Sequence, residues 1–170
     1  MRIANLILYC ALMGAVWSSE AAAEVPSGNA DGWHTWQVDE PGVSADMCCF
    51  SWQKGKKLRG ACNLDGRNIS FSDDGNCTDS QSPGSVQVYV NFDNGRPKSI
   101  HILSSNCAIS TESEIMDHGV VSSSENLAWF RAVIEDKTQR QKVREDALFA
   151  LVMSQSDAAY DYLNRLLTKR

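Results

Sequence analysis

The chain has 170 residues, of which 43% are hydrophobic and 22% are charged, and its net charge at pH 7 is −5. This composition is typical of globular proteins and excludes a collagen-like, low-complexity or wholly disordered chain. A mildly acidic chain without a large basic stripe is also not expected to bind nucleic acid as its main ligand.

The first 23 residues have the layout of a secretory signal peptide. Arg2 precedes an almost uninterrupted apolar run from Ile3 to Trp17, and the small residues of 21–23 suit cleavage after Ala23. The run is shorter than the roughly 20 residues that a membrane-spanning helix needs. We therefore expect residues 1–23 to be removed, which leaves a periplasmic or secreted protein of 147 residues without a membrane span.

Residues 24–118 are predicted to form a small antiparallel β domain. Alternating polar and apolar residues, or runs of β-prone residues, indicate strands at 33–38, 47–52, 86–92 and 97–104, with weaker candidates at 58–64 and 68–72. Between the third and fourth of these runs lies Asp93-Asn94-Gly95. Asn-Gly between two alternating runs is the strongest short-range signal for a hairpin, so we expect these two strands to pair in a sheet or partial barrel.

This β half contains all five cysteines of the mature chain, Cys48, Cys49, Cys62, Cys77 and Cys107. An exported protein can keep disulfides, and an odd number of cysteines leaves one unpaired. Adjacent residues of a strand point to opposite sides, so Cys48 and Cys49 should reach different partners. The expected partners are Cys62 and Cys107, which end apolar strands, whereas Cys77 lies in a polar loop and is the candidate free thiol.

The sequence predicts no catalytic site, cofactor or metal site. It has no Cys-x-x-Cys pair, and His34, His101 and His118 are scattered along it. The first two fall in strand patterns, and His118 is expected in the connection between the halves. The acidic loop at 73–79 does not match a calcium-binding loop. The alternative function is a small exported enzyme or enzyme inhibitor that uses the cysteine-rich β half. If Cys77 were its nucleophile, a base such as a histidine would have to lie nearby.

Residues 119–170 contain no cysteine or proline and are predicted to form three helices, at about 125–135, 139–153 and 158–169. The second half of the middle helix is apolar on most sides, which indicates neighbours on two faces. Its apolar residues cannot all meet the same neighbour, so the second side is covered either by the β half or by a partner. Leu148, Phe149 and Val152 are the candidate partner-binding residues.

The segment at about 139–169 resembles a HEAT repeat, the helical pair that stacks in solenoid proteins. The matching positions are Val143, Ala147, Leu148, Leu151, the turn Ser154–Asp157, Ala159, Leu163, Leu166 and Leu167. A single unit departs from the family, because a solenoid usually needs three or more repeats to bury its core. The helix at 125–135 or the β half must therefore close it.

The whole chain also resembles bacterial exported proteins that combine a Gly-Trp-x-x-Trp opening, a Cys-Cys pair and terminal HEAT units. Here these are Gly32, Trp33 and Trp36, then Cys48 and Cys49. The resemblance implies a fold and a compartment but no chemistry. Together these features predict an α+β protein with a disulfide-containing β domain and a short HEAT-like unit. We expect an exported, non-enzymatic protein-binding or scaffold protein, whose partner is another envelope or secreted protein.

Overall fold

The structure is a computed structural model that describes residues 25–27, 30–39, 47–66, 69–70, 85–154 and 156–168. The predicted signal peptide, the acidic loop at 73–79 and Cys77 lie outside the described residues. The described strands are β1 (Gly32–Asp39), β2 (Phe50–Gln53), β3 (Lys56–Arg59), β4 (Ala61–Asn63), β5 (Ile69–Ser70), β6 (Ser85–Asp93), β7 (Arg96–Ser104), β8 (Ile109–Ser110) and β9 (Ile115–Val121). The helices are α1 (Ser123–Glu135), α2 (Gln141–Ser154) and α3 (Asp157–Thr168).

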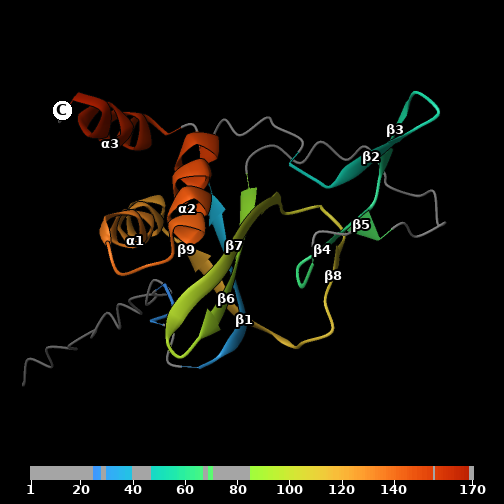
Figure 1. Ribbon diagram of the computed structural model, residues 1–170, viewed down its shortest axis with the longest axis horizontal. Helices are drawn as coiled ribbons and strands as arrows, with labels where there is room; N and C mark the ends of the chain where they lie inside the picture. Colours follow the sequence, from blue (N-terminus) through green and yellow to red (C-terminus); the bar gives the residue numbers. More distant parts are fainter. Residues whose placement is uncertain are drawn as a thin grey trace, which may run out of the picture.

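A four-stranded sheet with the order β7-β6-β1-β9 forms the centre of the fold, and the helices lie on one side of it (Figure 1). Its neighbouring strands are antiparallel except for β1 and β9, which are parallel. Two smaller sheets, β2-β3 and β5-β4-β8, complete the described strands. This mixed sheet followed by three helices confirms the predicted α+β class.

The predicted hairpin at 86–104 is confirmed as β6 and β7. Its two turn residues, Asn94 and Gly95, have φ angles of 52° and 70°. Two successive positive φ angles are the mark of a type I′ turn, which matches the twist of the strands and explains why Asn-Gly is used. Lys54 and Gly55 make a second turn of this kind between β2 and β3.

The predicted boundary between residues 118 and 119 falls inside β9. This strand and β8 lie in a region where the sequence pattern indicates no strand, and the weak candidate at 58–64 is divided between β3 and β4. His118 therefore belongs to the central sheet rather than to a linker. Because β9 pairs with β1 and runs directly into α1, the chain passes from sheet to helices without a separate connection.

The start of α1 is a capping box. The Ser122 hydroxyl accepts a hydrogen bond from the Glu125 backbone N–H, and the Glu125 carboxylate accepts one from the Ser122 backbone N–H. Such a pair satisfies two backbone donors that a helix N-terminus otherwise leaves without partners. The serines at 122–124 are thus the helix start that the sequence predicts.

The main core lies between the sheet and the three helices, and it draws on both predicted halves. The sheet contributes Trp36, Val38, Val88, Val90, Phe92, Ile100 and Val121, and the helices contribute Phe130, Val133, Ile134, Val143, Ala147, Ala150, Leu151, Ala159 and Tyr162. Trp129 packs at its edge, with its ring 5.3 Å from that of Trp36. The three helices therefore bury their apolar sides against the sheet.

One buried hydrogen bond joins α1 to the sheet. The indole N–H of Trp36 donates to Asn126 Oδ1 at 3.0 Å, and both side chains are buried. Burying an indole is favourable only when its N–H finds an acceptor. Asn126 supplies that acceptor, which explains a buried polar residue in an otherwise apolar helix face.

We expect Asn126→Ala to lower the free energy of unfolding by about 1–3 kcal/mol, because it leaves a buried donor without a partner. Denaturant unfolding of the single variants and the double variant measures the effect as a double-mutant cycle. In a Trp36→Phe background the donor is absent, so Asn126→Ala should cost much less. An equal cost in both backgrounds would contradict the role of this bond.

The opposite face of the sheet carries a second, smaller core. Its buried residues are Trp33, Cys62, Leu64, Tyr89 and Leu103. Two disulfides border it, Cys48–Cys107 and Cys49–Cys62. The four cysteines expected in bridges are thus the four that are joined, and the adjacent pair is divided between two bridges. Cys48–Cys107 attaches the segment before β2 to the connection that follows β7, and Cys49–Cys62 joins the same segment to β4.

Candidate functional site

The α2 helix has one side in the core. Val143, Ala147, Ala150 and Leu151 are at most 1% exposed. They meet α1, α3 and the sheet, and all four lie on the inner side of α2. The helix is therefore held in place along its whole length.

The other side of α2 carries large apolar side chains at the surface. Leu148 is 36% exposed, Phe149 63% and Val152 44%. On a helix, residues three or four apart are neighbours, so Leu148 and Val152 lie side by side, and Phe149 adjoins Val152. We call these three residues the α2 outer face. In the part of the chain that the structure describes, the strands of the β half leave these three side chains exposed.

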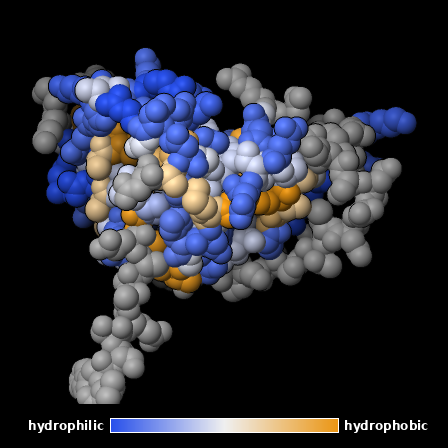
Figure 2. All heavy atoms as spheres, turned by 90° about the horizontal axis from the view of Figure 1, so that it is seen from below, coloured by the Kyte–Doolittle hydropathy of each residue, from blue (hydrophilic) through white to orange (hydrophobic). Residues whose placement is uncertain are grey.

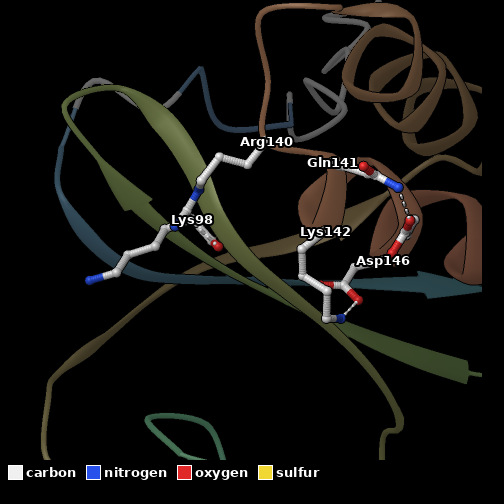
Figure 3. Close-up of polar contacts among 6 residues, drawn as sticks. Lys98, Arg140, Gln141, Lys142 and Asp146 are labelled. Carbon is white, nitrogen blue, oxygen red and sulfur yellow. Dashed lines mark hydrogen bonds and ion pairs between the residues drawn. The ribbon is translucent and has the colours of Figure 1, made fainter.

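The first turns of α2 are polar, which limits the α2 outer face to the second half of the helix. The Gln141 amide donates to Glu145 Oε1 at 2.8 Å, and Lys142 pairs with Asp146 (Figure 3). Both pairs are four residues apart on the same helix. These polar side chains are therefore already paired within α2. The unpaired part of this side of the helix is the apolar one, at Leu148, Phe149 and Val152.

Two arginines fix the orientation of α2. The Arg140 guanidinium donates to the Lys98 carbonyl of β7 at 2.7 Å, as Figure 3 shows. Lys98 lies where the register between β6 and β7 slips, and such a bulge leaves a backbone group outside the ladder. Arg144 Nε donates to the carbonyl of Ile134 in the last turn of α1 at 2.8 Å. These cationic side chains satisfy backbone acceptors, so their position has a structural reason.

An apolar hollow lies on the inner side of the last turn of α2. The hollow is small, with room for no more than about one water molecule. Val38, Val86 and Val88 line it from the sheet, and Ala150 and Met153 line it from α2. The end of α2 is therefore bordered by apolar atoms on both its inner and its outer side.

The third helix is packed only in part. Ala159 and Tyr162 are buried, and the Arg131 guanidinium lies 4.9 Å from the centre of the Tyr162 ring. Leu166 is 37% exposed and Leu167 72%, although the HEAT resemblance counts both among its matching positions. In Figure 1 the C-terminal end of α3 extends past the other helices.

Apolar surface also occurs elsewhere on the molecule. Figure 2 shows separate apolar areas within a mainly hydrophilic surface on the face seen from below. Scattered apolar residues are normal on protein surfaces, whereas neighbouring ones on one element indicate an interaction site. The α2 outer face is distinguished because its three exposed residues lie on a helix whose opposite side is packed against α1, α3 and the sheet.

Two of the three histidines, His34 and His118, come together in the structure although they are far apart in the sequence. His34 of β1 and His118 of β9 are in contact, with 2.8 Å between His34 Nδ1 and His118 Nε2. Sequence reasoning missed this pair because it depends on the parallel pairing of β1 with β9. His101 lies on the other face of the sheet with its ring 5.6 Å from Trp33, and burial lowers the pKa of His101 against the opposing effect of Asp146.

Comparisons with known proteins assign no family to the chain. It matches no family model, no curated protein and no solved structure. The two disulfides fit an oxidising compartment. In the parts of the chain that the structure describes, none of the helices is long and apolar enough to cross a membrane.

Proposed function

We propose that the protein is an exported, non-enzymatic protein-binding or scaffold protein, and that the α2 outer face contacts its partner. The observation that carries this proposal is the exposure of three neighbouring apolar side chains, Leu148, Phe149 and Val152, on a well-anchored helix. Exposing adjacent apolar residues to water is unfavourable, and a partner that covers them gains the corresponding free energy. The resemblance to HEAT repeats, which bind proteins along helical faces, adds to this argument.

Export is supported by the signal-peptide layout of residues 1–23 and by the two disulfides. In this proposal the partner is another envelope or secreted protein. The polar groups beside the α2 outer face are already paired within the helix. The contact is therefore mainly hydrophobic, and its affinity should depend only weakly on salt concentration.

We expect Leu148→Glu and Val152→Glu to weaken partner binding at least tenfold while the protein stays folded. A charge at the centre of an apolar contact must be desolvated on binding, which removes more than about 1.4 kcal/mol of affinity. Substitutions of exposed residues usually change stability by no more than about 0.5 kcal/mol. The measurement is affinity capture by the mature chain from its native envelope, followed by a titration of the purified partner.

Leu167→Glu is the matched control, because it places the same charge at another exposed leucine. It should leave both folding and binding unchanged. Undiminished binding by Leu148→Glu and Val152→Glu would show that the partner uses another surface. Truncation is less informative, since α2 and α3 supply much of the main core and their removal would expose the sheet.

A further inference from the structure

The two histidines of β1 and β9 make a direct side-chain contact inside the fold. The His34 ring is 3% exposed, and the plane of the His118 ring is inclined to it by only 6°. His34 also meets the Phe92 ring at 5.0 Å between ring centres. This places a pair of titratable groups beside the main core, with His34 buried and His118 half-buried, and solvation of a charge on His34 is poor.

The backbone brings His118 to this position. β9 is an edge strand: it pairs with β1 on one side, and none of the described strands pairs with its other side. Its register on β1 shifts between Thr35 and Gln37. Gly119 adopts a φ of 72° at the slip, and its N–H donates to the Asp117 carboxylate at 2.9 Å. Where the backbone hydrogen bonds between β1 and β9 are interrupted, the His34–His118 hydrogen bond therefore connects the two strands through their side chains.

The hydrogen-bond partners determine where the protons lie. His34 Nε2 is 2.9 Å from the Ala30 carbonyl oxygen, which can only accept, so Nε2 carries a proton. In a neutral imidazole the other nitrogen is then an acceptor. His34 Nδ1 therefore accepts, and His118 Nε2 donates to it. This contact needs His34 to be neutral.

We propose that His34 and His118 form a proton-sensitive clamp that holds β9 on β1 at neutral pH and loosens it when both imidazoles become charged. A first added proton goes to the free nitrogen of His118, which keeps its N–H toward His34 and becomes a stronger donor. A second proton must go to His34 Nδ1. Two N–H groups then face each other at a separation suited to one hydrogen bond, and two positive charges share a poorly solvated site.

The surrounding charges oppose full protonation. Burial lowers the pKa of His118, the charge of His34 lowers it further, and Asp117 raises it. The other contacts of His34, the Phe92 ring and the Ala30 carbonyl, do not titrate. Within the folded pair, the hydrogen-bond geometry and burial both oppose the second proton, so the folded form loses stability relative to the unfolded form as the pH falls below the ordinary histidine pKa of about 6.5. Acidification therefore opens the clamp.

Amide hydrogen exchange of the full mature chain at pH 7 and pH 5, corrected for intrinsic rates, tests the clamp. We expect protection of residues 115–121 to fall roughly thirtyfold relative to β6, because pH 5 lies about 1.5 units below the ordinary histidine pKa. In His118→Gln the difference should shrink to within about threefold, since an amide can donate to a neutral His34 or accept from a charged one. His101→Gln, which removes the other histidine of lowered pKa, should behave like the wild type.

Imidazole ¹⁵N chemical shifts of the wild-type protein provide a second measurement that needs no variant. We expect His34 at pH 7 to carry its proton on Nε2 and none on Nδ1, which accepts from His118. The clamp is overturned by a proton on His34 Nδ1 at pH 7, or by two charged rings with β9 still protected. Equal protection of 115–121 at both pH values, or loss of the pH effect in His101→Gln, overturns it as well.

Discussion

We expect removal of the Cys48–Cys107 disulfide to lower the free energy of unfolding by about 4 kcal/mol. The bridge spans 59 residues of sequence, and a cross-link that closes a long loop restricts the unfolded chain most in the chain-entropy account. Domains of this size are stable by only about 5–15 kcal/mol. The double variant Cys48→Ala with Cys107→Ala should therefore be close to unfolding at moderate denaturant concentrations.

The Cys49–Cys62 bridge is the matched control. Its Cα–Cα distance of 5.2 Å is nearly that of the first bridge, 5.1 Å, but it spans only 13 residues. The same account predicts a loss of about 3 kcal/mol for Cys49→Ala with Cys62→Ala. Denaturant unfolding of both double variants measures the difference. A smaller loss for the longer loop would show that local packing around the cysteines, rather than loop length, sets their contribution.

The second large effect is expected at Phe130 of α1. This side chain is 1% exposed in the core that joins the helices to the sheet. Phe130→Ala removes most of a buried ring and leaves a cavity, which should lower the free energy of unfolding by about 3–5 kcal/mol. Thermal and denaturant unfolding should show this loss as a lower transition midpoint with a single cooperative transition, because the sheet and the helices share this core.

Phe149→Ala is the control for this substitution, because it deletes the same ring from a position that is 63% exposed. It should change stability by no more than about 0.5 kcal/mol. It should also weaken the proposed partner contact, since Phe149 belongs to the α2 outer face. Separate transitions for the sheet and the helices in Phe130→Ala would contradict a shared core.

Local features of the fold were predictable where a short stretch of sequence contains all the interacting groups. The β6–β7 hairpin follows from Asn94-Gly95 between alternating runs, since a type I′ turn needs two residues that accept positive φ. The start of α1 follows from the serines at 122–124 and Glu125, because the capping box is made within four residues. The helices at 141–154 and 157–168 follow from their apolar spacing in the same way.

The strand β9 was not predictable, for a physical reason. It is an edge strand with one covered side, and its sequence, IMDHGVV, includes a bulge at Gly119 that breaks the alternation of side chains. Its partner β1 lies about 80 residues earlier in the chain. A boundary drawn at residue 119 on composition therefore falls within a strand that belongs to the central sheet.

The sequence by itself determined the β6–β7 hairpin, the three helices, the cysteines available for bridging and the apolar composition of α2, because each depends on residue type or on neighbours within a few residues. Only the tertiary structure decided which residues face outward and which groups meet. The same helix contains the buried Leu151 and the exposed Val152, and the sheet covers one but not the other. The contact of His34 with His118 likewise arises from a parallel pairing of distant strands, and no local pattern encodes such a contact.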